Sequence, residues 1–209
     1  MKEKFLNSLE ELRKKAPKRN FNQSVDLIIN LKDFDTRKNS LNTFAQLPFP
    51  PSENKICAFV ERPSKAFDFC ITKSEIDDWK EKKDIKKLAR DYDFFASIPQ
   101  LMSLVATKFG RILGPPGKMP SPQLGLITSY DEKSMQELAD KLRKIVRIKA
   151  KEPSVKIRIG KENMDNDKIA QNAEVVYNTA ANALPRKKEN IRSVMIKLTM
   201  SKPVKLDLK

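Results

Sequence analysis

An alternating stretch near the C-terminus places the strongest constraint on the fold. Residues 192–205 read RSVMIKLTMSKPVK, and apolar side chains occupy every second position of their first part. The apolar positions are Val194, Ile196, Leu198 and Met200, and the positions between them are Ser193, Met195, Lys197 and Thr199. A period of two is typical of a strand with one buried face. The other face is either an ordinary solvated strand surface or one that hydrogen-bonds the sugar edges of a polyanion.

The same alternation occurs twice more, at residues 24–32 and 155–160. Amphipathic helical patterns accompany these strands over residues 3–15 and 165–184. Residues 33–48 are predicted to be a loop with a short extended piece. The two ends of the chain therefore share one style of helices and half-buried strands. We predict that they fold together as an α+β domain.

Between Pro50-Pro51 and Pro153 the pattern changes. Residues 55–60 form a continuous apolar run, typical of a strand buried on both faces. Short apolar runs then alternate with helical patterns as far as residue 149, and Ser74 fits the N-cap of the first helix. Such alternation predicts an α/β unit with a parallel sheet. We place the split α+β domain at residues 1–53 and 153–209, and the inserted α/β domain at 54–152.

Charge narrows the range of partners. The chain has 42 Lys and Arg against 27 Asp and Glu, a net charge of +15. Nucleic acid is the commonest partner of so basic a protein, because Lys and Arg release counterions from phosphates. The alternative partners are an acidic protein or a membrane surface, and a further alternative is that the protein is simply soluble and basic. The split domain has 22 basic and 13 acidic groups, net +9, whereas the inserted domain is +6 from 20 and 14.

Several polar side chains fall at outward positions of the predicted strands of the split domain. They are Ser24, Lys32, Lys156, Arg158, Ser193, Lys197 and Thr199. If these strands pair, the side chains gather on one face or at one edge of a sheet, which favours nucleic-acid binding. Phe21 stands alone among polar residues just before the first strand, and either packs on the core or is an exposed aromatic.

Much of the usual repertoire of enzyme side chains is missing from the sequence, although Ser/Lys or carboxylate chemistry is not excluded. The chain has no histidine, which excludes histidine triads, histidine bases and histidine metal ligands. Residues 114–118 fail as a phosphate loop, because Met119 replaces the required Ser or Thr and two prolines remove amide donors. We predict no catalytic site, metal or cofactor. A nucleotide-dependent enzyme using the inserted domain remains the alternative, because fold alone does not exclude it.

Neither cysteine belongs to a redox or metal motif. Cys57 and Cys70 lack CxxC spacing and lie in apolar surroundings, so we predict buried, reduced thiols. No apolar run is long enough to span a bilayer, and the N-terminus lacks the apolar core of an export signal. We therefore expect a cytoplasmic protein without a membrane partner.

Four stretches carry a resemblance to a known family. They are residues 18–31 (KRNFNQSVDLIINL), 113–122 (LGPPGKMPSP), 164–172 (MDNDKIAQN) and 191–203 (IRSVMIKLTMSKP). In these stretches, which span nearly the whole chain, the sequence resembles the L-one family of large-subunit ribosomal proteins, most closely the archaeal branch. The first and last stretches are the most specific. The resemblance implies the same split α+β domain, with an inserted Rossmann-like α/β domain.

The resemblance also implies a function. Members are structural, non-enzymatic proteins that bind the stalk region of large-subunit ribosomal RNA through the split domain, beside the tRNA exit site. It further implies a cytoplasmic ribosomal location, a monomer when free, help in releasing deacylated tRNA, and repression of the protein's own mRNA. By motif position the RNA-contacting residues are Phe21, Ser24, Ser193, Thr199 and Met200. Ser201 and Lys202 lie in the same turn and complete the expected RNA-binding set.

Two positions depart from the family pattern. Ser201 stands where the family usually has glycine, which permits positive φ and a close backbone approach. This puts a tight backbone-to-ribose contact in question. Pro116 stands where the family often has arginine, so any contact by that arginine is absent.

Overall fold

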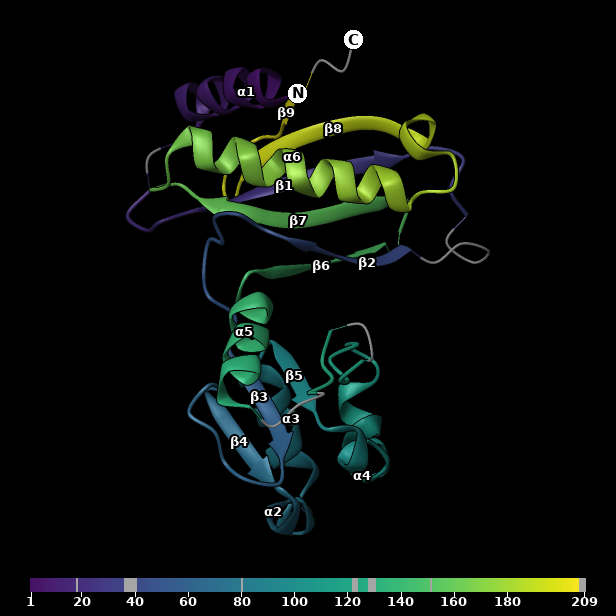
Figure 1. The fold of residues 1–209 in the computed structure, drawn as a ribbon. Coiled ribbons are helices and arrows are strands. Elements are labelled where there is room, and N and C mark those ends of the chain that lie inside the picture. The colour runs from purple at the N-terminus through teal and green to yellow at the C-terminus, as the bar shows by residue number, and fades with distance from the viewer. Residues whose placement is uncertain are drawn as a thin grey trace. The chain divides into compact units, whose positions relative to one another are not determined.

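The architecture is mixed α and β, as the sequence predicts. A computed structural model describes residues 1–17, 19–35, 41–79, 81–121, 124–127, 131–150 and 152–206. Its elements form two compact units (Figure 1), one of Met1–Ser52 with Lys144–Lys209 and one of Glu53–Arg143. We call them unit 1 and unit 2. The second boundary comes before Lys144, earlier than the predicted break at residue 153.

A four-stranded antiparallel sheet is the centre of unit 1. Its strand order is β7 (Ser154–Lys161), β1 (Ser24–Leu31), β8 (Ile191–Leu198) and β9 (Val204–Lys205). Leu27 of β1 pairs with Ile157 on one side and Ile196 on the other. Every second residue of β1 is buried, so the predicted alternation of this strand is confirmed. The short helix η2 (Lys187–Asn190) leads into β8.

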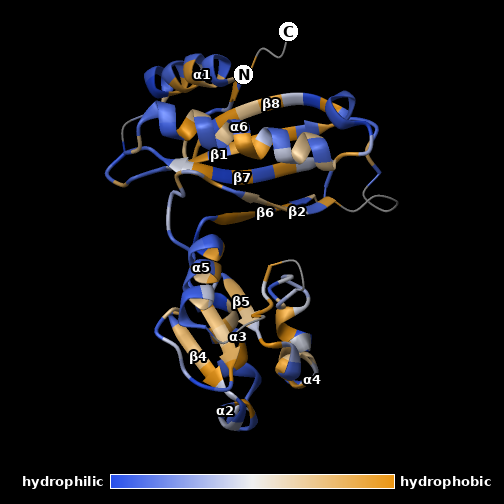
Figure 2. Cartoon of the chain, in the orientation of Figure 1, coloured by the Kyte–Doolittle hydropathy of each residue, from blue (hydrophilic) through white to orange (hydrophobic). Residues whose placement is uncertain are grey.

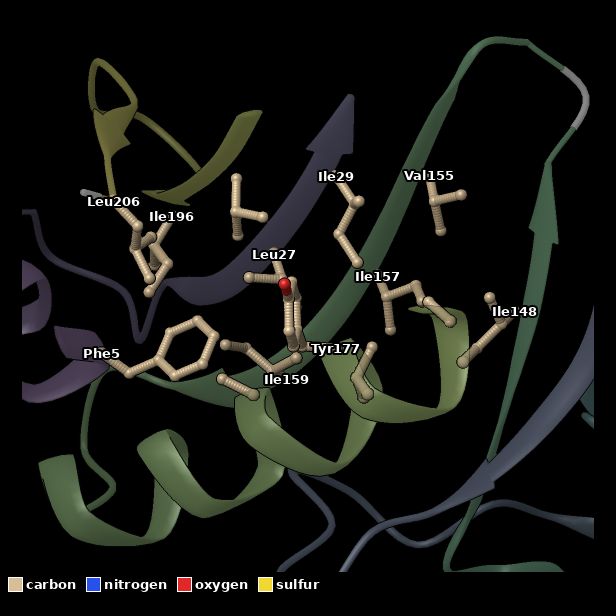
Figure 3. Close-up of a cluster of buried hydrophobic side chains, with 14 of the residues drawn as sticks. Phe5, Leu27, Ile29, Ile148, Val155, Ile157, Ile159, Tyr177, Ile196 and Leu206 are labelled. Carbon is tan, nitrogen blue, oxygen red and sulfur yellow. The ribbon is translucent and has the colours of Figure 1, made fainter. Parts of the chain in front are cut away.

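Two helices cover one face of this sheet, α1 (Lys2–Lys15) and α6 (Asn166–Ala183). Phe5 of α1 meets Tyr177 of α6 edge-on, with ring centroids 6.4 Å apart. Figure 3 shows these rings beside aliphatic side chains from the sheet, among them Leu27 and Ile159. Helix and strand approach so closely that a Cβ at Gly160 would lie 2.8 Å from Cγ1 of Ile169. A larger residue at position 160 would therefore displace the side chain of Ile169 or α6 itself.

A second antiparallel pair belongs to unit 1. β2 (Leu41–Gln46) pairs with β6 (Ile145–Ala150), and Leu47 N–H donates to the Lys144 carbonyl at 2.8 Å. The sequence predicted a loop with a short extended piece over residues 33–48, of which 36–40 lie outside the described residues. It placed the strand at 146–149 in the inserted domain. β6 belongs to unit 1 because its apolar residues, such as Ile148, are buried in the unit 1 core.

Unit 2 is built on a parallel sheet. Its strand order is β4 (Phe69–Thr72), β3 (Ile56–Val60) and β5 (Phe94–Ser97). All five residues of β3 are buried, which confirms the strand predicted to be covered on both faces. Figure 2 shows the apolar character of this sheet. The other elements of unit 2 are α2 (Lys73–Asp78), α3 (Lys82–Asp91), η1 (Pro99–Leu101), α4 (Met102–Leu113) and α5 (Glu132–Arg143).

Two local expectations for unit 2 change. Thr72 rather than Ser74 caps α2, because Thr72 and Glu75 form a reciprocal capping box. Both cysteines are free thiols as predicted, but Cys57 is buried whereas Cys70 is half-buried. Burial raises the pKa of both thiols, so both are protonated at neutral pH.

Candidate nucleic-acid interface

The face of the unit 1 sheet that points away from the helices carries several basic side chains. Arg158 pairs with Asp26, which pairs with Lys197, so these three residues form a row across the strands. Lys156, Ile28 and Met195 form the next row. Lys156 and Arg158 are exposed and Lys197 is half-buried. The structure therefore brings three of the predicted basic residues onto one sheet face.

The exposed basic side chains of β7 have weak partners within unit 1. Lys156 Nζ lies 3.4 Å from Glu152 Oε2, and both side chains are largely exposed. Exposed ion pairs of this kind contribute little, about 0–1 kcal/mol, and are screened by salt. Arg158 Nη2 donates to Ser52 Oγ at 2.8 Å. Both cations can thus exchange these contacts for phosphate oxygens at small cost.

Thr199 joins the end of β8 to the start of β1. Its N–H donates to the Ser24 carbonyl at 3.1 Å, and its Oγ1 accepts the Ser24 N–H at 3.1 Å. The outward position predicted for Thr199 is confirmed, since the residue is exposed. Its hydroxyl is nevertheless engaged with β1. Because a hydroxyl has two lone pairs and one proton, it retains capacity for a further partner.

Two large apolar side chains are exposed beside this junction. Met200 is 53% exposed and Phe21 is 52% exposed. They lie at the same end of the sheet, because Met200 N–H donates to Oε1 of Gln23, two residues after Phe21, at 3.0 Å. The alternation that placed Met200 on the buried face is wrong, since β8 ends at Leu198 and the chain turns there. Phe21 is an exposed aromatic, which resolves the alternative left open for it.

Ser201 closes the turn with its own side chain. Its N–H donates to the Leu198 carbonyl at 3.1 Å, and its Oγ accepts the Leu198 N–H at 2.9 Å. Among the described residues, Asp33 and Lys187 are the non-glycines with positive φ. Ser201 therefore makes this turn without the left-handed backbone that glycine permits. Lys202 follows it and is exposed.

Two predicted residues lie at the opposite end of the sheet. Lys32 is exposed just past β1, whereas Ser193 is only 7% exposed and its Oγ accepts a hydrogen bond from Asn30 Nδ2 at 3.0 Å. Ser193 lies on the outward sheet face as predicted, since it pairs with Asn30, but neighbours such as Arg192 and Lys205 leave little of its side chain exposed. A strand rises about 3.3 Å per residue, so Ser193 lies roughly 20 Å from Thr199 and Lys32 roughly 25 Å from it.

Among the described residues, no cluster of three or more His, Cys, Asp or Glu side chains could hold a metal ion. No described helix is long and apolar enough to cross a membrane. Lys118, the lysine of the rejected phosphate loop, donates to the carbonyls of Ala89 at 2.9 Å and Tyr92 at 2.7 Å. It is thereby held against the backbone of unit 2.

A basic sheet face beside exposed aromatic and apolar side chains is typical of a protein that binds nucleic acid. The chain belongs to the ribosomal protein L1p/L10e family, whose model matches residues 12–202. It is 35% identical to large ribosomal subunit protein uL1 of Pyrobaculum calidifontis, over 98% of this chain and 94% of that protein. It is 34% identical to uL1 of Thermococcus kodakarensis, over 99% and 98%. Identity to uL1 of Nanoarchaeum equitans is 36%, over 95% and 99%. These relatives confirm the archaeal type of the resemblance.

Three features of the interface escape sequence analysis. Gln23 is fully buried although it lies in a polar segment, and the Thr199 hydroxyl is tied to β1. The third feature is the hydrogen bond that the side chain of Asn30 donates to the Ser193 hydroxyl. Each arises from contacts between residues more than 130 positions apart, so no local pattern signals them. The outward phase of Asn30 on β1 was the only available hint.

Proposed function

We propose that this protein is a structural constituent of the large ribosomal subunit and binds the stalk region of its ribosomal RNA through unit 1. The family membership and the names of the relatives support the assembly. The observation that carries the RNA site is the Thr199–Ser24 junction. It gathers Phe21, Ser24, Thr199 and Met200 at one end of the sheet, next to the basic face.

The interface would use two kinds of contact. Lys156, Arg158, Lys197 and Lys202 neutralise phosphates and supply affinity that falls with salt. Phe21 offers a ring on which an unstacked base or a ribose can pack, and Met200 offers adaptable apolar surface. The hydroxyls of Ser24 and Thr199 and the backbone beside them are donors and acceptors for ribose 2′-hydroxyls. The combination suits recognition of a folded RNA by its shape.

Finer roles belong to the same proposal. As part of a stalk beside the tRNA exit site, the protein would assist release of deacylated tRNA. A similar fold in its own mRNA would compete for the same face and allow repression of translation. The protein would act in the cytoplasm on the ribosome and be a monomer when free. Units 1 and 2 would be separate domains, with the RNA site on unit 1.

Binding to a transcript of the large-subunit rRNA stalk tests the proposal. We expect the full chain to bind it at least about a hundredfold more tightly than a stem-loop of equal length and shuffled sequence. Phe21→Ala and Met200→Ala should each weaken stalk binding while leaving the melting temperature nearly unchanged, since both side chains are exposed. A thermal shift with ATP, GTP or NAD, but none with the transcript, would refute the proposal and favour a nucleotide-dependent enzyme.

A further inference from the structure

Gln23 is a fully buried polar residue beneath the proposed RNA interface. Its exposed fraction is 0%, although its neighbours Asn22 and Phe21 are exposed. Its Oε1 accepts the Met200 N–H at 3.0 Å. Its backbone carbonyl accepts the Glu162 N–H at 2.8 Å, and its own N–H lies 3.3 Å from the Glu162 carboxylate. Gln23 thus joins the turn after β8 to the turn after β7.

The side chain of Gln23 supplies a hydrogen-bond acceptor for Met200 where the backbone supplies none. The pairing of β1 with β8 ends where Thr199 N–H donates to the Ser24 carbonyl. The carbonyl of Gln23, the residue just before β1, accepts the Glu162 N–H. The Met200 N–H therefore finds its acceptor in a side chain, Oε1 of Gln23. Together with the two hydrogen bonds between Ser201 and Leu198, this bond holds the backbone of Met200 beyond the end of the sheet.

Packing alone does not explain an amide at this position. Nε2 of Gln23 is buried and has no hydrogen-bond partner among the described residues. A buried donor without a partner is destabilising relative to an apolar side chain of the same size. The amide is accounted for by its oxygen, because an apolar residue would leave the Met200 N–H without this acceptor. The orientation of the Gln23 side-chain amide follows from the Met200 N–H, because this donor must face the oxygen of the amide and not its nitrogen.

We propose that Gln23 is a positioning residue for the RNA interface and does not touch the RNA. It holds the backbone of Met200 so that the side chains of Thr199 and Met200 face the ligand before binding. Preorganisation of this kind raises affinity because less conformational freedom is lost on association. The proposal rests on the proposed function, since it concerns the same site and the same stalk RNA.

Two variants of the full chain separate the oxygen of Gln23 from its volume. Gln23→Met has similar length but lacks the acceptor, and it also removes the unpartnered donor. Gln23→Glu keeps an oxygen acceptor in either protonation state of its carboxyl group. Dissociation constants would be measured with the stalk rRNA transcript, at several salt concentrations, together with the melting temperature. Val176→Ala serves as the control, because it opens a cavity in the α6 core away from the turn.

We expect Gln23→Met to bind the transcript about tenfold more weakly, because a tenfold change corresponds to the loss of about one hydrogen bond. Its salt slope should equal that of the parent, because no phosphate contact is removed. Gln23→Glu should restore the affinity to within about threefold of the parent. Val176→Ala should lower the melting temperature by several degrees yet bind within about twofold of the parent, so that lost stability alone does not imitate lost positioning.

The contrary results are distinguishable. If the parent protein does not bind the transcript, the proposed function fails and the positioning role fails with it. If the parent binds and Met200→Ala weakens binding, but Gln23→Met binds like the parent, the positioning role is overturned while the function stands. If Gln23→Met and Gln23→Glu both lose affinity in proportion to a lower melting temperature, Gln23 is a structural residue only.

Discussion

Replacing Thr199 by valine removes a hydroxyl that serves both the fold and the proposed RNA interface. Valine keeps the shape and the β-branch of threonine. The hydroxyl accepts the Ser24 N–H at 3.1 Å and lies 3.4 Å from the Ser24 carbonyl oxygen. An outward strand position by itself predicts a solvated hydroxyl, whose loss changes stability little. The structure predicts a measurable loss, because the first amide of β1 loses its partner.

The magnitude follows from that hydrogen bond and its exposure. A typical intramolecular hydrogen bond contributes about 0.5–1.5 kcal/mol net. Thr199 is exposed, so water can replace the hydroxyl at the Ser24 N–H, and the lower part of that range applies. We expect the free energy of unfolding to fall by about 0.5–1 kcal/mol. For a chain of 209 residues this lowers the melting temperature by about 1–4 °C.

The effect on RNA binding should be larger. A ribose or phosphate partner left unpaired in the interface costs about 1–3 kcal/mol, a loss of roughly 5- to 150-fold in affinity. Fluorescence anisotropy with a labelled stalk rRNA transcript measures this loss, and calorimetry measures the melting temperature. Thr199→Ser is the matched control, because it keeps the hydroxyl and loses only the methyl group. It should bind within about threefold of the parent.

Two results would refute this reasoning. Thr199→Val could bind the transcript as tightly as the parent while its melting temperature falls by more than about 8 °C. Thr199 would then be a structural tie between β8 and β1 and no part of the interface. Equal losses of affinity in the valine and serine variants would instead assign the effect to the shape of the side chain.

The remaining predictions concern charge, domain division and pH. The logarithm of the association constant for stalk RNA should fall linearly with log salt, by about 0.7–0.9 per phosphate contact. Lys202→Ala should weaken binding to all RNAs alike and reduce that slope by about one contact. A binding constant that does not change with salt would contradict the proposed phosphate contacts. A short Gly/Ser linker from Ser52 to Lys144 should leave unit 1 folded with most of its RNA affinity, because β2 keeps its partner β6. A linker from Ser52 to residue 153 should give a less stable protein, because it removes β6. If the variant linked from Ser52 to Lys144 folds but does not bind the RNA, the RNA site lies outside unit 1. Burial raises the pKa of the Cys57 and Cys70 thiols. The unfolded thiols ionise first, near pH 8.5, so the free energy of unfolding is undiminished below that pH and falls as the pH rises above it. Urea titrations between pH 7.5 and 9.5 should show this fall, and the Cys57→Ala variant should lose most of it; an equal pH dependence in parent and variant would exclude Cys57 as its source.

The elements themselves were largely predictable, because their patterns are local. Alternation along β1 and β7 decided which side chains face the core, and the continuous run in β3 decided that both its faces are covered. Pro50 and Pro51 lie at the first boundary between the two units, whereas Pro153 lies inside unit 1. Most outward positions on the strands followed from the same periodicity, including those of Ser24, Lys156 and Arg158.

Strand partners and the ends of strands were decided only by the tertiary structure. β6 reads as a strand from its sequence, but its place in unit 1 depends on β2, about a hundred residues earlier. Alternation put Met200 in the core, whereas the turn closed by Ser201 exposes it. The environments of Ser193 and Gln23 likewise depend on segments distant in the chain. Periodicity fixes the face of a residue only while its strand continues, and which distant group meets it depends on how the strands pair.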